Sequence, residues 1–242
     1  WIYQLGTSPA CPRLRQGCRF FVHNFWLAQQ YGVHVPREMV VRPPINPTHL
    51  AQAAAYALPA RQRSNIVLIN GHDLPKDALE TIQAACARTR AGGAGLALGG
   101  EVKCEVPHGY GKRALRQLMG RAKVVVAWCM RGTERLPIEA ALYGAVLLSN
   151  NCAVGSDERD FPLPPQHRLP TAQAIGEAIT ALLSSNEAYE AALAQQLPLQ
   201  TLYKNLGPAS MAEEARAFLR AAAQPQPAEE LAHCTRVENM PP

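Results

Sequence analysis

Short apolar runs alternate with amphipathic stretches through the middle of this chain. The amphipathic stretches repeat apolar positions at helical spacing, and residues 75–92 begin with a proline and end with a glycine, as helices often do. Apolar strands separated by helices are typical of a parallel sheet covered on both faces. The pattern predicts a doubly wound α/β domain. Its expected strands are NIVLING (65–71), GLALGGE (95–101), KVVVAWC (123–129) and AVLLSN (145–150), and further helices are expected at 112–122 and 137–144.

The flanking regions follow other patterns. Before the alternating region we expect a strand at 19–22, a helix that ends at Gly32, and a strand within 38–47 that is stopped by prolines. After about residue 170 the strands end, and residues 171–196 and 209–223 are helical by period and by their Ala, Leu and Glu content. The tail that follows lacks a core pattern.

The composition is that of an ordinary folded protein. The 242 residues are 48% hydrophobic and 18% charged, with a formal net charge of +5. The basic residues are scattered and are not interleaved with aromatic residues, which excludes a nucleic-acid surface. No apolar run approaches the roughly 18 residues of a membrane span. We therefore expect a soluble, cytoplasmic protein.

The seven cysteines have wide and irregular spacing and form no CxxC pair. Such spacing fits neither a zinc site nor the framework of a small disulfide-rich domain. Because cysteine packs well in cores, we expect reduced thiols. The seven are Cys11, Cys18, Cys86, Cys104, Cys129, Cys152 and Cys234.

The stretch RGTERLPIEAALYG (131–144) places charges between two of the most apolar runs. In an open parallel sheet this position lies beyond the carboxyl end of a strand, where ligands bind. Pro137 suits a first helical turn, Glu139 is expected in the same turn beside the positive end of the helix dipole, and Gly144 ends the helix. Two roles remain open for Glu139. It stabilises the helix by about 0.3–1 kcal/mol, or it binds a polar ligand such as a sugar nucleotide, together with Glu134 and the free N–H groups of the turn.

From Leu136 onward this stretch resembles a glycosyltransferase motif, E-G-F-G-L-P-x-x-E-A-x-x-x-G. The motif belongs to the C-terminal, donor-binding domain of retaining GT-B glycosyltransferases of the group 1 or family 4 kind. Glu134 to Ala140, ERLPIEA, is also similar to the E/D-R-I-P-x-E-A sequence of glycosyltransferase-like proteins. The resemblance implies a hexosyltransferase-type enzyme with a nucleotide-sugar donor and a sugar, lipid or protein acceptor. It also implies that Glu139 holds the ribose of the donor.

The resemblance implies further site residues and has two departures. The first glutamate of the motif falls on Arg131, so Glu134 would take over its contact with the donor sugar. The loop after the first strand, NGHDLPKD, offers only Lys76 and His72 to phosphate. We therefore predict Glu134 and Arg131 as catalytic residues. The predicted donor-binding residues are Glu139, Gly132, Thr133, Arg135, Lys76, Gly71, His72 and His108. For the arginines and Lys76, a solvated surface position is the alternative.

Metal and nicotinamide chemistry are not expected. The chain has no Asp-x-Asp, and DERD at 157–160 has the wrong spacing for metal binding and is expected to be a solvated loop. No G-x-G-x-x-G follows the first strand, which argues against a dinucleotide-dependent oxidoreductase. We expect no cofactor and no metal.

The same resemblance suggests how the chain is organised. Residues 1–45 would be a remnant of an N-terminal domain with the interdomain crossover, 46–222 the Rossmann-like donor-binding domain with C-terminal helices, and 223–242 a flexible tail. Because the sequence begins at Trp1 rather than Met, we expect a fragment or processed form that lacks most of the N-terminal domain. The alternative is a non-catalytic Rossmann-like interaction or scaffold module derived from a glycosyltransferase.

Overall fold

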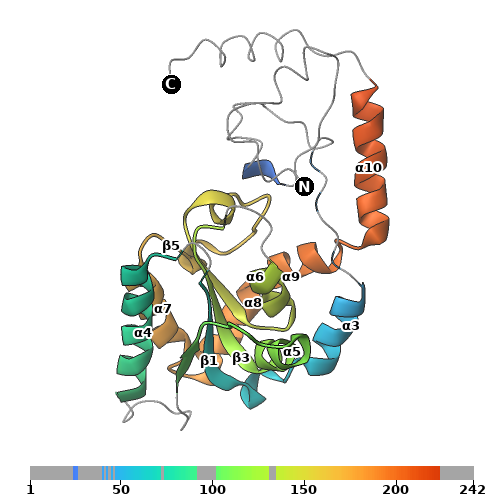
Figure 1. Ribbon diagram of the computed structural model, residues 1–242. Coiled ribbons are helices and arrows are strands. Elements are labelled where there is room, and N and C mark those ends of the chain that lie inside the picture. The colour runs from blue at the N-terminus through green and yellow to red at the C-terminus, as the bar shows by residue number, and fades with distance from the viewer. Residues whose placement is uncertain are drawn as a thin grey trace, which may run out of the picture. The chain divides into compact units, whose positions relative to one another are not determined.

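The computed structural model describes residues 24–26, 40, 42, 45, 47–71, 74–91, 102–130 and 135–223 (Figure 1). The chain divides into two compact units, Ile45–Gly207 and a second made of Trp1–Pro44 with Pro208–Pro242. In the second unit, helix α10 (Pro208–Ala222) carries Glu214, whose carboxylate accepts bonds from the main-chain N–H of Arg42 at 2.8 Å and from its guanidinium at 2.7 and 3.1 Å. The expected strand at 19–22 and the tail after residue 223 lie outside the described residues.

The larger unit contains a parallel sheet and seven α-helices among its described residues. The strands are β1 (Ser64–Asn70), β2 (Lys103–Glu105), β3 (Ala122–Ala127), β4 (Val146–Asn150) and β5 (Arg168–Leu169). The helices are α3 (Pro47–Tyr56), α4 (Lys76–Ala91), α5 (Lys112–Arg121), α6 (Arg135–Leu142), α7 (Ala172–Leu182), α8 (Asn186–Gln195) and α9 (Leu197–Lys204). Three short 3₁₀ turns are η2 (Ala60–Gln62), η3 (Ala153–Ser156) and η4 (Pro165–His167).

All five strands run parallel, in the order β2-β1-β3-β4-β5. The chain therefore builds outward from β1 to one edge, and then returns to the other side of β1 with β3. The point where the order reverses, between the carboxyl ends of β1 and β3, is where open α/β sheets bind their ligands. The doubly wound α/β fold predicted from the sequence is confirmed.

Helices cover both faces of the sheet because each central strand is apolar on both. On one face, alternate residues such as Val67, Val124 and Leu148 pack with Ile82 of α4 and Ile179 of α7. On the other face, α5 and α6 pack on β1, β3 and β4, with α3 and α9 outside them (Figure 1). Every residue of β3 and β4 is buried, which explains why apolar residues predominate in both.

Most predicted elements are present within a few residues of their expected bounds. The single helical stretch expected at 171–196 is divided into α7 and α8, because Ser185 caps α8 by accepting a bond from the N–H of Ala188 at 3.0 Å. The strand expected at 95–101 lies outside the described residues, and the strand paired with β1 is Lys103–Glu105. Helices α3 and α9 were not predicted.

Helix α6 begins at Arg135, two residues earlier than expected. Pro137 still lies in the first turn, where its missing N–H has no helical partner. Glu139, however, is the fifth residue of the helix, so its expected place in the first turn was wrong and a simple helix-dipole role loses its basis. The helix ends as predicted, because Gly144 has a φ of +94° and the N–H groups of Gly144 and Ala145 bond to Ala141 and Ala140.

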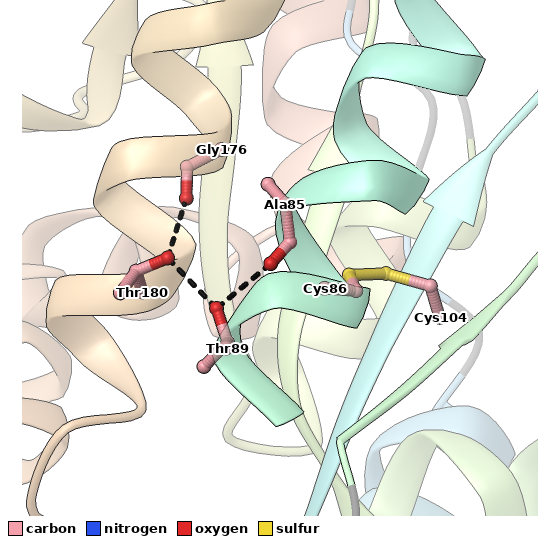
Figure 2. The surroundings of a disulfide bond; sticks show 6 residues. All are labelled: Ala85, Cys86, Thr89, Cys104, Gly176 and Thr180. Carbon is pink, nitrogen blue, oxygen red and sulfur yellow. Dashed lines mark hydrogen bonds between the residues drawn. A yellow bond between two sulfur atoms is a disulfide. The ribbon is translucent and has the colours of Figure 1, made fainter. Parts of the chain in front are cut away.

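Four cysteines are paired, so the expectation of reduced thiols was wrong for them. Disulfides join Cys86 to Cys104 and Cys129 to Cys152. Figure 2 shows the first, between α4 and the strand beside β1. The spacing of cysteines along the chain did not reveal these pairs, because the sheet brings together residues 18 and 23 positions apart.

Figure 2 also shows how closely α4 and α7 approach each other. The hydroxyls of Thr89 and Thr180 are hydrogen-bonded at 2.8 Å, each hydroxyl also lying within bonding distance of a carbonyl of its own helix. A Cβ on Gly176 would lie 2.6 Å from the Cβ of Ala85, so this glycine allows the two helices to touch.

The acidic run at 157–160 is not the solvated loop that the sequence suggested. Asp157 and Asp160 are buried, and the guanidinium of Arg159 binds both carboxylate oxygens of Asp157, at 3.0 and 2.6 Å. Burial alone would raise the pKa of Asp157, but the bonds from Arg159 and the nearby charge of Arg168 hold it below its usual value. The run is therefore part of the fold.

Candidate functional site

The carboxyl ends of β1 and β3 form the edge of the sheet where the chain order reverses. β1 ends at Asn70 and is followed directly by Gly71. β3 ends at Ala127, and the first residue of α6, Arg135, follows eight positions later. The N-terminus of α6 is thus close in sequence to this edge, and its first N–H groups have no helical partners.

Gly71 lies where the loops after β1 and β2 meet. A Cβ at this position would approach the Cγ1 of Val106 to 3.0 Å, which is tighter than ordinary van der Waals contact. Val106 follows β2, so this glycine is explained by close packing between the loops after β1 and β2. The role of Gly71 in ligand binding remains a prediction.

The chain that leads from β3 towards α6 is tied to the loop after β4. The side-chain oxygen of Asn150 accepts a bond from the N–H of Cys129, and the N–H of Val154 donates to the carbonyl of Met130 at 2.8 Å. The disulfide between Cys129 and Cys152 joins the same two loops. Cys129 has a φ of +39°, in the left-handed region. These contacts fix the backbone just before the predicted catalytic stretch.

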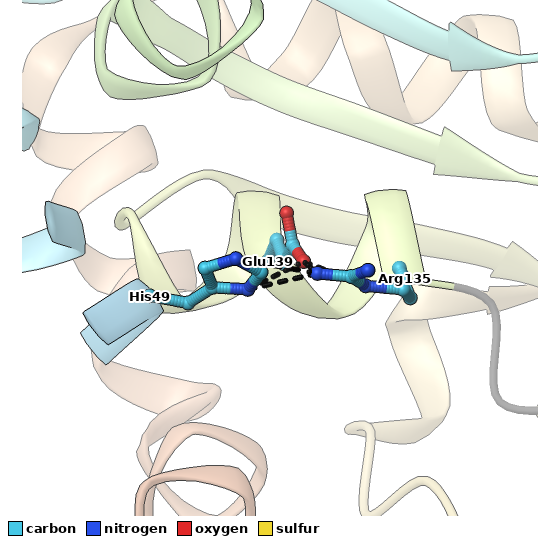
Figure 3. A network of polar contacts seen from close by, with 3 residues as sticks. All are labelled: His49, Arg135 and Glu139. Carbon is cyan, nitrogen blue, oxygen red and sulfur yellow. Dashed lines mark hydrogen bonds and ion pairs between the residues drawn. The ribbon is translucent and has the colours of Figure 1, made fainter. Parts of the chain in front are cut away.

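Glu139 is the centre of a small polar network that joins two helices (Figure 3). The guanidinium of Arg135 donates to Oε1 of Glu139 from Nε at 3.0 Å and from Nη2 at 2.8 Å. The Nδ1 atom of His49, from α3, lies 3.1 Å from the same oxygen. The Glu139 side chain is 15% exposed, that of His49 is 21% exposed, and that of Arg135 is 71% exposed.

All of these contacts use one oxygen of the carboxylate. Within the part of the chain that the structure describes, no group is hydrogen-bonded to the other oxygen, Oε2. Figure 3 shows one carboxylate oxygen among the dashed contacts and the other pointing away from them. Glu139 is therefore anchored at one atom and keeps a free acceptor at the other, which is a suitable arrangement for binding a hydroxyl group.

A proton on Nδ1 of His49 decides which of its two neighbours this nitrogen bonds. Nδ1 lies 2.9 Å from Nη2 of Arg135 as well as 3.1 Å from Oε1 of Glu139. A ring nitrogen accepts from a guanidinium only when it carries no proton, and donates to a carboxylate only when it carries one.

The remaining predicted site residues are not drawn into this network. Lys76 is the first residue of α4, is 90% exposed and pairs with Glu80 at 3.6 Å. His108 is exposed on the loop after β2, where its main-chain N–H donates to Val106 at 2.8 Å. Neither forms a hydrogen bond or ion pair with Glu139. Five predicted residues lie outside the described ranges: Arg131, Gly132, Thr133, Glu134 and His72.

The sequence analysis did not identify His49. It lies in PTHLAQAAAY, which became α3, and 86 positions separate it from Arg135. The available signals were Pro47, a residue type common in a first helical turn, and the alanines that follow it. They indicate a helix here, but not that it packs against α6.

The described residues were also searched for metal-binding groups and for membrane-spanning helices. Groups of three or more His, Cys, Asp or Glu side chains able to hold a metal ion were not found among them. None of the helices that the structure describes has the length and hydropathy needed to cross a membrane.

Comparison with known proteins gives a distant likeness to a solved structure. No protein-family model and no curated protein matches this sequence. Among solved structures, the chain is similar to the crystal structure of AviGT4, a glycosyltransferase involved in avilamycin A biosynthesis, with 15% identity and a TM-score of 0.45. The similarity covers 84% of this chain and 63% of that one, so the chain spans less than two thirds of the length of AviGT4.

Proposed function

We propose that this chain supplies the donor-binding half of a glycosyltransferase of the hexosyltransferase type. The enzyme would transfer a sugar from a nucleotide-sugar donor to a sugar, lipid or protein acceptor. The donor would bind at the carboxyl edge of the sheet, between the loop after β1 and the N-terminus of α6. A second domain would provide the acceptor wall of the cleft.

The free oxygen of Glu139 is the observation that carries this proposal. A carboxylate that stabilised only its own helix would need no fixed orientation, whereas this one is anchored through Oε1 by two side chains from two helices. Its Oε2 is open to a ligand and can accept a bond from a ribose hydroxyl. The motif that resembles glycosyltransferases, LPIEAALYG, assigns the same task to Glu139.

The diphosphate of the donor would be held by cations and main-chain N–H groups rather than by a metal. Arg135 and Lys76 are exposed and stand at the starts of α6 and α4, where helix N-termini favour anions. In the proposed reaction, Arg131 and the N–H groups of Gly132 and Thr133 stabilise the leaving diphosphate as charge develops on it. Glu134 holds the donor sugar in line with the acceptor.

One observation favours the alternative, a non-catalytic interaction module. Glu139 is paired with Arg135 and contacted by His49. These contacts are sufficient for a carboxylate whose role is to join α3 to α6. The two functions differ in whether a nucleotide binds.

Titration of the chain with UDP, GDP, ADP and their common sugar conjugates tests the proposal. A ligand that binds only the native state raises its stability, so both calorimetry and thermal unfolding report binding. We expect one nucleotide to bind and its affinity to fall at least tenfold in Glu139→Ala. The matched control is Glu177→Ala, because Glu177 also accepts a bond from the residue four positions earlier, on the exposed side of α7. A folded protein that binds none of these ligands would support the interaction module.

Activity gives a second test. We expect the isolated chain to bind its nucleotide sugar and to transfer no sugar, because both walls of the cleft are needed to align donor and acceptor. Detectable transfer by the purified chain would contradict this part of the proposal.

A further inference from the structure

We infer that His49 is a positioning residue of the donor site, which acts through Glu139 by holding Oε1 so that Oε2 faces the ribose of the donor. This inference rests on the proposed function and adds a residue from a helix that precedes the sheet. His49 need not touch the ligand. Its effect is to fix the carboxylate before the nucleotide arrives.

Arg135 alone would hold Glu139 weakly. The two belong to the same helix, four positions apart, and the Arg135 side chain is 71% exposed, so their pair has the small stabilisation typical of solvated ion pairs. His49 comes from α3 and is four-fifths buried. A contact from a second, packed helix restricts the rotamers of Glu139 and lowers the entropy lost when a ligand binds it.

His49 can hold Oε1 only through a proton on Nδ1, because a ring nitrogen donates to a carboxylate only when it carries one. Both the Nδ1–H tautomer of the neutral ring and the protonated ring supply that proton.

The decisive experiment compares a nucleoside diphosphate with its 2′,3′-dideoxy counterpart, using whichever of UDP, GDP and ADP binds the chain most tightly. Only the first has the hydroxyls that Oε2 would bind, and both share the phosphates. We expect His49→Ala to weaken the ribonucleotide about fivefold to tenfold, the effect of one well-placed hydrogen bond, and to change the dideoxy affinity less than twofold. His49→Asn, which keeps a polar atom near the place of Nδ1, should recover most of the loss.

The comparison of the two nucleotides separates positioning from a purely structural role. A residue needed only for the fold would change both affinities alike, so an equal loss of both in His49→Ala would overturn the inference. A failure of His49→Asn to recover the ribonucleotide affinity would overturn it as well.

A measurement without ligand separates this inference from the proposed function. The ring nitrogen resonances of His49, observed by NMR, should move in Glu139→Gln and stay in place in Glu177→Gln. If they do not move in Glu139→Gln, His49 does not anchor Glu139, whether or not nucleotides bind. If they move and no nucleotide binds the native chain, the proposed function fails, and the role of His49 in ligand binding fails with it.

Discussion

Two arginines at opposite ends of the sheet show how differently polar residues are used in this molecule. Arg63, directly before β1 at the amino end, is buried, and its guanidinium donates to the main-chain carbonyls of Leu58, Ala122 and Tyr143. Arg135, on the carboxyl side, is largely exposed and bonds the side chains of Glu139 and His49. Arg63 is bonded to main-chain atoms, whereas the partners of Arg135 are side chains, which can rearrange around a ligand.

Two other polar residues, beside the edge of β4, are used in the same structural way as Arg63. Gln196 is fully buried, and its side-chain amide bonds both the N–H and the carbonyl of Leu147, at 2.9 and 2.6 Å. Because β5 pairs with β4 only at residues 149 and 150, this amide continues the ladder where β5 is missing. Gln196 also lies 2.6 Å from Nδ1 of the buried His167. A histidine and a polar partner here belong to the fold.

The largest effect is expected from removing Arg63. In Arg63→Ala, three main-chain carbonyls lose a donor, two of them in buried bonds. Since each unpaired buried group costs roughly 1–3 kcal/mol, we expect a loss of about 3–5 kcal/mol in the free energy of unfolding. Urea denaturation measures it. Arg61→Ala is the control, because Arg61 is exposed and pairs with Glu190 on the surface; we expect no measurable change there. Equal stability of the two variants would contradict the role given to Arg63.

Removing Gln196 should have the next largest effect. Gln196→Ala leaves the N–H and carbonyl of Leu147 unpaired in the core and opens a small cavity, so a loss of about 2–4 kcal/mol is expected in urea unfolding. The neighbouring Gln195 is exposed, and Gln195→Ala should leave the denaturation midpoint almost unchanged. A similar midpoint for both variants would mean that water replaces the Gln196 amide at no cost.

Acid should destabilise the fold through His167. Burial lowers the pKa of His167 to about 4, while an unfolded histidine titrates near 6.5. Between these values the unfolded chain binds a proton that the native chain excludes, so stability falls as the pH decreases from 6.5 to 4, by up to about 3 kcal/mol. Urea midpoints measured across this range test the sign. His167→Gln should remove this dependence; a slope that persists unchanged in the variant would assign it to other groups.

The sequence was most informative where a segment is buried on both sides. The runs that became β1, β3 and β4 are mostly apolar because helices cover both faces of each strand. Helix α3 escaped prediction because Ala53 is its only fully buried residue, which leaves little periodicity to detect. Strand β2 has only three residues, none of them fully buried, so it too leaves little periodicity to detect.

From the sequence, only the parts of the candidate site that depend on residues close together in the chain could be predicted. Arg135 and Glu139 could be proposed from the sequence because they lie close together at a strand end, a position set by neighbouring residues. His49 could not be identified, since only the packing of α3 against α6 brings it to Glu139. Two pairs of cysteines were missed for the same reason: contacts between distant segments are set by the arrangement of the sheet.

The smallest effect on stability is expected at Glu139, where the contrast with Arg63 becomes sharpest. Glu139→Gln keeps the shape of the side chain and leaves no buried main-chain group unpaired, because the contacts of Glu139 are to the side chains of Arg135 and His49. Since partly exposed ion pairs contribute about 0–1 kcal/mol, the urea midpoint should move little. A loss of 3 kcal/mol or more, on the scale of Arg63→Ala, would instead make the network part of the fold's framework. Near-native stability together with lost nucleotide affinity would show that Glu139 is held in place for a ligand.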